Sequence, residues 1–213
     1  MATQSKSAMA RLVDWIDARL PIRRALSTHV TEYYAPKNFN ILYVFGVLAG
    51  VVLVNQILTG IWLVMYYKPD GALGATGIPI AYASLETAVM RDANWTWLIR
   101  YMHAVVASRF FIVVYLHMFR GLIYGSHRKP RELVWIFGML IYLVLMAEAF
   151  MGYVLPYGQM SFWGAQVIIS LFGAIPYIGD TLVTGIRGDF VISEATLSRF
   201  FALHVIALPL VLV

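Results

Sequence analysis

The sequence predicts an all-α, polytopic membrane protein built as a four-helix transmembrane bundle, and three observations support this prediction. Apolar residues make up 61% of the 213 residues and charged residues 13%, whereas soluble domains contain about 25% charged residues. Basic residues lie mainly beside long apolar runs. There are four such runs, at residues 41–67, 95–124, 133–155 and 196–213. Since roughly 20 residues cross the hydrocarbon core, the first three runs can span it, and the fourth is expected to be truncated at Val213.

The first 35 residues precede the bundle, which we assign to residues 36–213. Four apolar residues recur at helical spacing among charged ones: Leu12, Trp15, Ile16 and Leu20. This pattern predicts a short amphipathic helix on the membrane surface, followed by a lead-in to the first span. A soluble helix that packs against a partner fits the same pattern. The segment lacks the short apolar core of a cleavable signal peptide.

Lysine and arginine residues orient the spans, because cytoplasmic loops are enriched in them. Six precede the first span: Lys6, Arg11, Arg19, Arg23, Arg24 and Lys37. Three more, Arg128, Lys129 and Arg131, crowd the loop at residues 125–132. We therefore expect a cytoplasmic N-terminus, with the second and fourth spans running in the same direction. The position of the basic residues beside the spans argues against a nucleic-acid partner.

The connection at residues 156–198 is long and lies on the outer face in this topology. Its run SFWGAQVIISLFGAI is apolar, but it is too short to span and is bounded by glycine and proline. Connections of this length usually have structure or function of their own. We expect one or two helices on the outer surface, with IPYIGD as the turn between them.

Two histidines, His103 and His117, lie fourteen residues apart within the second span. Fourteen residues turn a helix by about 1400°, roughly 40° short of four turns, and advance it about 21 Å. Both imidazoles therefore lie on one helix face, at two depths. A single buried histidine is most often a hydrogen-bonded core residue, so this pair alone does not decide the function.

Glycines repeat the same spacing, with Gly46 and Gly60 in the first span and Gly138 and Gly152 in the third. Glycine weakens a helix by about 1 kcal/mol relative to alanine, but it lets a bulky flat group approach the backbone. Two histidine levels facing two glycine levels predict two large planar cofactors stacked across the membrane. Haem with imidazole ligands fits this best. One zinc ion, with bonds of about 2 Å, cannot join ligands about 21 Å apart.

The fourth span contributes His204 near its outer end. Because the second and fourth spans are parallel, His204 is expected at the level of His103, where the two could hold one haem from both sides. The matching partner of His117 is expected fourteen residues after His204, beyond Val213. His127, in the inner loop, is a weaker substitute for that ligand.

Five runs of the sequence resemble the cytochrome b of bacterial cytochrome bc complexes, the ubiquinol–cytochrome c oxidoreductases. They are WLIRYMHA, YLHMFRGLIYGS, AFMGYVLPYGQMSFWGAQVI, GAIPYIGD and ATLSRFFALHVIALPL. The similarity begins near Thr28, and GYVLPYGQMSFWGA is highly specific. The resemblance implies a four-helix bundle enclosing two haem b groups, a low-potential outer one and a high-potential inner one. Each has two histidine ligands, and further spans follow in the family.

Individual positions of this sequence match the site residues of the family. His103 and His204 match the ligands of the outer haem iron, and His117 matches one ligand of the inner haem iron. The other matched haem contacts are Arg100 at an outer propionate, Arg120 and Ser126 at inner propionates, and Gly46, Gly60, Gly138 and Gly152 at the haem faces. A guanidinium suits a carboxylate at the membrane edge on chemical grounds as well.

The resemblance also implies a quinol-oxidation pocket near the outer haem. The residues that match its wall are Phe150, Tyr153, Gly158, Met160, Trp163, Gly164 and Ile168. Without the resemblance, helix packing and anchoring at the membrane interface would be the favoured explanation of these residues. The family's Pro-Glu-Trp-Tyr motif and its inner quinone pocket are expected later in the family's chain.

The implied function is electron transfer in the respiratory chain, as a subunit of a quinol–cytochrome c oxidoreductase. Quinol oxidised at the outer face gives one electron to a Rieske iron–sulfur protein. The other electron passes through two haems to quinone at the inner face, with net proton translocation. Further implied partners are cytochrome c1, membrane lipid and a second copy of the complex. The implied location is the bacterial inner (plasma) membrane, and no side chain here needs to act as an acid or base.

Arg109 and Glu148 are charged residues at similar membrane depth, in the second and third spans. An unpaired charge at that depth is costly. We therefore expect an ion pair between them, although Arg109 lies about 120° from the histidine face of its helix.

Three alternatives to the full respiratory subunit remain at the level of sequence. A haem-free transporter would use the intramembrane charges as a proton path and would bind no chromophore. The short split cytochrome b of photosynthetic quinol complexes also ends after four spans. A fragment that holds one haem or none in isolation is the third.

Overall fold

The computed structural model describes residues 7–18, 23, 27–32, 34 and 37–213, in two units, Met1–Asn40 and Ile41–Val213. In the first unit, α1 (Ala8–Asp17) begins at Ser7, whose side chain accepts a hydrogen bond from the Ala10 backbone at 3.2 Å. A short π-helix, η1, covers Ser27–Thr31. Leu20 and much of the expected lead-in lie outside the described residues, as does the side chain of His29. The assignment of residues 1–35 and 36–213 as domains stays a prediction.

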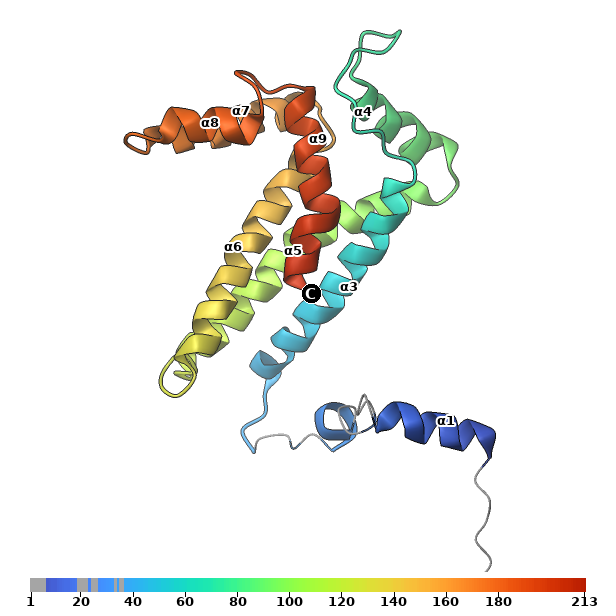
Figure 1. Ribbon diagram of the computed structural model, residues 1–213, viewed down its shortest axis with the longest axis vertical. Helices are drawn as coiled ribbons and strands as arrows, with labels where there is room; N and C mark the ends of the chain where they lie inside the picture. The colour runs from blue at the N-terminus through green and yellow to red at the C-terminus, as the bar shows by residue number, and fades with distance from the viewer. Residues whose placement is uncertain (1–6, 19–22, 24–26, 33, 35–36) are drawn as a thin grey trace, which may run out of the picture. The chain divides into compact units, whose positions relative to one another are not determined.

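Four helices of the second unit are long and apolar enough to cross a membrane. The first combines η2 (Ile41–Tyr43) with α3 (Val44–Val64), the second is α5 (Thr96–Ile123), the third is α6 (Glu132–Val154), and the fourth combines α9 (Glu194–Ala202), η5 (Leu203–Ala207) and α10 (Leu208–Leu212). They lie side by side in one bundle (Figure 1). The predicted fold class, an all-α multi-pass membrane protein, is confirmed.

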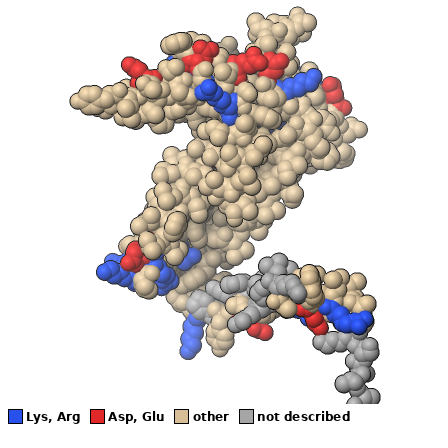
Figure 2. Space-filling view, in the orientation of Figure 1, with Lys and Arg blue, Asp and Glu red and all other residues tan. Residues whose placement is uncertain are grey.

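Most charged side chains of this unit lie at the two ends of the bundle. In Figure 2 a tan middle separates a basic group at the loop between α5 and α6 from a mixed group at the opposite end. The basic group contains Arg128, Lys129 and Arg131. In the middle, apolar side chains such as those of Val47, Val54 and Leu140 are exposed. A lipid environment explains this arrangement, because apolar side chains have nothing to gain there from burial against protein.

Shorter helices lie at the end of the bundle opposite the α5–α6 loop. They are α4 (Ile80–Ser84), η3 (Leu85–Asp92), α7 (Gln159–Leu171), η4 (Phe172–Ala174) and α8 (Gly179–Arg187). In Figure 1, α7 and α8 run across the ends of α6 and α9. The turn before α8 needs Gly179, because a Cβ there would collide with the backbone of Gly173. We call this end of the unit the α7–α8 end.

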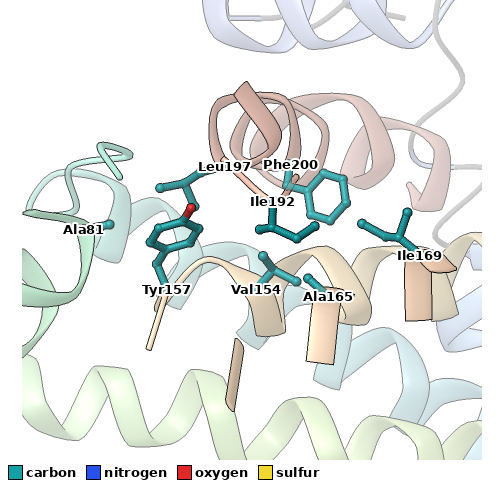
Figure 3. Close-up of a cluster of buried hydrophobic side chains, with 8 residues drawn as sticks. All are labelled: Ala81, Val154, Tyr157, Ala165, Ile169, Ile192, Leu197 and Phe200. Carbon is teal, nitrogen blue, oxygen red and sulfur yellow. The ribbon is translucent and has the colours of Figure 1, made fainter. Parts of the chain in front are cut away.

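The tightest core also lies at the α7–α8 end, where α6, α7 and α9 meet the segment around α4. Figure 3 shows its eight buried residues: Ala81, Val154, Tyr157, Ala165, Ile169, Ile192, Leu197 and Phe200. Beside it, the Tyr67 hydroxyl donates a hydrogen bond to the Leu155 carbonyl at 2.5 Å. Burial, and then the neighbouring Tyr157, raise the pKa of Tyr67. The Tyr67 hydroxyl therefore stays protonated and joins the end of the first span to the end of the third.

We expect Tyr67→Phe to lower the free energy of unfolding by about 1–2 kcal/mol, because the Leu155 carbonyl would lose its donor. Thermal unfolding of the purified protein in detergent measures this change. Tyr177→Phe is the matched control, since Tyr177 is 105% exposed. Equal unfolding temperatures for the two variants would contradict the prediction.

Candidate functional site

His103 of α5 and His204 of η5 face each other between the helices. Their ring centroids are 6.2 Å apart and their planes make an angle of 87°. Imidazole nitrogens on opposite sides of one metal ion are about 4 Å apart, and each lies about 1 Å in front of its ring centre. The observed separation of the ring centroids therefore leaves room for one metal ion that both imidazoles would hold. The sequence also predicted that these two histidines lie at one level.

Thr59, a buried residue of α3, determines the tautomer of His103. Its Oγ1 lies 2.6 Å from the Asn55 carbonyl and 2.9 Å from Nδ1 of His103. A hydroxyl has one hydrogen to donate, and the carbonyl can only accept. Nδ1 of His103 therefore donates to Thr59, and the lone pair of its Nε2 stays available to a metal. Gln56 holds the same turn of α5, donating from Nε2 to the His103 carbonyl at 3.0 Å.

Glu148 of α6 determines the tautomer of His204 in the same way. Nδ1 of His204 lies 3.0 Å from the Glu148 carbonyl and 2.9 Å from the Glu148 carboxylate. Both groups accept, so Nδ1 carries the proton and Nε2 is left free. Metal-binding histidines usually donate their second ring N–H to a carbonyl or carboxylate in this manner. The two imidazoles are thus held in orientations suited to coordination before any metal is considered.

A local π-turn, η5, presents His204. Proline lacks the N–H that would continue the α-helical ladder and crowds the carbonyl four residues earlier, and here Pro209 follows η5. The backbone N–H of Leu208 instead bonds to the Leu203 carbonyl. Single π-turns inside α-helices occur often at functional sites. Pro209 was the feature of the sequence that could have indicated this one.

Three of the four spaced glycines lie against histidine rings. A Cβ at Gly152 would come within 2.5 Å of Cε1 of His204, one at Gly60 within 3.3 Å of Cε1 of His103, and one at Gly46 within 3.0 Å of Cε1 of His117. Any side chain at Gly152 would therefore displace the imidazole. At Gly138 a Cβ would meet no described atom within 4 Å, which leaves open space on that side of α6.

His117 occupies the second level, toward the α5–α6 loop. Its Nδ1 is buried without a hydrogen-bond partner among the described residues. Arg120, one turn further along α5, lies over the Tyr43 ring at 5.5 Å. His127 contacts Trp135, with ring centroids 5.8 Å apart. In the part of the chain that the structure describes, no ring contact joins His117 to a second histidine.

The donor set fits haem. Two imidazoles with free Nε2 atoms face one another at the first level, His117 offers an imidazole at the second, and glycines in α3 and α6 keep Cβ atoms away from all three rings. Haem iron takes imidazole as an axial ligand. A site made only of side chains is a poorer fit, since no cluster of three or more metal-binding groups occurs among the described residues.

The residues expected at the propionates lie at the two ends of the bundle, with Arg100 at one end and Arg120 and Ser126 at the other. Arg100 is half-buried near the start of α5, where it lines a cavity of about 550 Å³ together with Glu86 and Arg109. Ser126 is half-buried beyond the other end of α5, with its backbone N–H bonded to the Gly121 carbonyl at 2.8 Å. Nε of Arg120 is buried without a hydrogen bond to any described group.

The residues matched to the quinol pocket form a partly open surface at the α7–α8 end. Phe150 packs on Phe200 with ring centroids 5.7 Å apart, and Gly164 brings α7 against the Tyr153 ring. Gly158 makes a similar close approach to the Tyr82 ring. The side chains that remain exposed are Tyr153, Met160, Trp163 and Ile168. An apolar substrate entering from lipid would meet these four.

The expected ion pair between Arg109 and Glu148 is wrong. Within the described ranges no ion pair joins them, and the Glu148 carboxylate contacts His204 instead. Arg109 lies on the face of α5 that lines the cavity with Arg100 and Glu86. Similar depth was not enough, because the rotation of each helix about its axis points the two side chains in different directions.

Thr59 and Gln56 were not predicted from the sequence, and the partner predicted for Glu148 was wrong. One feature could have identified Thr59, which precedes Gly60 and so lies at the level of His103. Nothing in the pattern distinguished Gln56 from other polar residues of the span.

Comparisons with known proteins show which proteins this chain is similar to. The sequence profile of the family described as Cytochrome b/b6/petB matches residues 30–213. The cytochrome b of Allochromatium vinosum is 59% identical over 192 residues, which are 90% of this chain and 44% of that protein. The cytochrome b of Arabidopsis thaliana is 52% identical over 193 residues, which are 91% of this chain and 47% of that protein.

One solved structure, described as "Hyperthermophilic respiratory Complex III", contains a chain that is 40% identical and superposes with a TM-score of 0.80. The match covers 94% of this chain and 51% of that one. The chain therefore spans about half the length of the relatives that it matches.

Proposed function

Because this chain belongs to the cytochrome b/b6/petB family, we propose that it is the haem-binding part of the cytochrome b subunit of a respiratory quinol–cytochrome c oxidoreductase. The observation that carries the proposal is the facing pair of imidazoles, His103 and His204, with both Nδ1 atoms held and both Nε2 atoms free. Haem b, when bound there, accepts and passes on one electron at a time.

The chain's own residues set the position of the haem and the polarity of its surroundings. Thr59 and Glu148 orient the two ligands, while Gly60 and Gly152 leave room for them. His117 and Gly46 provide half of a second site, which we assign to a second haem b. The two levels lie about 21 Å apart along α5. Electrons would then cross most of the membrane inside this bundle.

The distribution of charge supports an orientation with the α5–α6 loop and the N-terminus in the cytoplasm and the α7–α8 end outside. His103 and His204 then hold the outer haem, and His117 the inner one. Arg100 would pair with an outer propionate, and Arg120 and Ser126 with inner ones. The location we propose is a bacterial inner membrane.

We place quinol oxidation at the α7–α8 end, next to the outer haem. Tyr153, Met160, Trp163 and Ile168 are exposed there and would contact the apolar part of the quinol. Phe150, Gly158 and Gly164 would shape the wall behind them. The proposed acceptors are a Rieske iron–sulfur protein for one electron and the outer haem for the other. Cytochrome c1 and a second copy of the complex are the further proposed partners, and quinone reduction at the inner face completes proton translocation.

A haem-free transporter is the weaker candidate. Such a transporter would bind no chromophore, so it gives no reason for the contacts of three glycines with the rings of three histidines.

Haem stoichiometry tests the proposed function. A pyridine haemochrome assay on the purified membrane complex is expected to give two haem b per copy of this chain. His103→Leu and His204→Leu should each remove one haem and leave the same spectrum behind, whereas His117→Leu should remove the other. A wild-type complex without haem would refute the proposal, and loss of different haems from the first two variants would refute the pairing.

Glycine substitutions test the contacts with the imidazoles. Gly152→Ala is expected to weaken binding of the outer haem roughly five- to thirtyfold, because the displaced His204 loses a hydrogen bond of about 1–2 kcal/mol. Gly46→Ala should weaken the inner haem instead. Reduced-minus-oxidised spectra during haem titration measure both effects.

Gly50→Ala is the control for this series, since a Cβ there meets no described atom within 4 Å. It should keep both haems at wild-type affinity. If Gly152→Ala bound both haems as tightly as Gly50→Ala, the glycines would not be required next to the ligands.

A further inference from the structure

Glu148 places a carboxylate inside a membrane-spanning helix, where acidic side chains are rare. Its side chain is 15% exposed and that of His204 is 16% exposed, with Oε1 2.9 Å from Nδ1 of His204. The second oxygen, Oε2, is buried without a hydrogen bond among the described residues. Carboxylates inside a membrane bundle are costly and generally have a function. The contact with an imidazole that is also a proposed haem ligand indicates what that function is.

The two facing histidines differ in the hydrogen-bond partners of their Nδ1 atoms. Nδ1 of His103 donates to the Thr59 hydroxyl, a neutral acceptor. Nδ1 of His204 lies within hydrogen-bond distance of the Glu148 carbonyl and, slightly closer, of the Glu148 carboxylate. Hydrogen bonds to an ionised acceptor are roughly twice as strong as neutral ones. His204 is therefore the ligand that receives the greater electron density from its hydrogen-bond partner.

We propose that Glu148 is a positioning residue for His204, whose carboxylate fixes the imidazole and lowers the reduction potential of the outer haem. The inference rests on the proposed function. An acceptor on the second ring nitrogen raises the basicity of a ligating imidazole, and hydrogen bonding around the ligands is one of the protein's means of setting haem potentials. A negative charge at this distance favours ferric over ferrous iron, because the ferric site carries one more positive charge.

The backbone carbonyl of Glu148 does not make the side chain redundant. It would hold the ring with any residue at this position, so its effect is the same in every variant. Only the side chain adds a charge. Substitutions at position 148 therefore separate the contribution of the carboxylate from that of the carbonyl, which stays in place.

The test is a potentiometric titration of both haems in the membrane complex that contains Glu148→Gln. The glutamine keeps the shape and an acceptor oxygen but removes the charge. We expect the equilibrium of the outer haem to shift about tenfold toward the reduced form, which is about 59 mV for one electron. The low-spin ferric EPR signal of the same haem should shift as well. The inner haem, in the same sample, should keep its potential.

Two further variants serve as controls. Glu132→Gln makes the same change in the same helix, sixteen residues away or about 24 Å, and should leave the outer potential unaltered. Glu148→Ala removes the side chain but keeps the carbonyl, and should raise the outer potential at least as much as Glu148→Gln. If Glu148→Gln loses the outer haem, Glu148→Asp should restore it, because it keeps the charge.

An outer potential and EPR signal unchanged in both Glu148→Gln and Glu148→Ala would overturn the inference, as would failure of Glu148→Asp to restore a lost haem. A shift of equal size in Glu132→Gln would also overturn it. These outcomes are distinct from failure of the proposed function, which would appear as a wild-type complex without haem.

Discussion

An imidazole that binds metal inside a membrane needs one ring nitrogen held and the other left free, and the rest of this structure depends on that requirement. Water is absent there, so a helix must supply the acceptor for Nδ1. For His103 it is Thr59 on α3, and for His204 it is Glu148 on α6. Each proposed ligand of the outer haem is therefore fixed by a helix other than its own, and the helices must pack closely enough for these bonds to form.

Close packing in turn requires glycine. The helices that supply acceptors also bring their backbones against the rings, at Gly60 for His103 and at Gly152 for His204. In lipid there is little hydrophobic force to drive helices together, so small residues and interhelical hydrogen bonds do most of this work. The same residues thus hold the bundle together and shape its site, and the stability of the bundle cannot be separated from ligand geometry.

The buried hydrophobic core of the second unit lies at the α7–α8 end. The buried core there, together with the bond from Tyr67 to the Leu155 carbonyl, joins the ends of three spans. His103 and His204 lie next to this core, whereas His117 lies toward the opposite end of the bundle. The site next to the core is the one where the proposed quinol surface and the proposed outer haem would have to meet within a short distance.

The sequence by itself determined the four helices and the two histidine depths within α5, and it predicted that His103 and His204 lie at one level. The length of an apolar run indicates whether the run can cross the membrane. The period and rise of an α-helix relate the spacing of two residues in the sequence to their helix face and their depth. Tertiary structure decided which residues face one another across helices. Thr59 could not be assigned and Glu148 was assigned to Arg109, because a partner depends on the rotation of each helix about its own axis. Packing between helices sets that rotation, for example where Gly152 meets His204 and in the π-turn before Pro209. The spacing of residues along one helix gives no information about it.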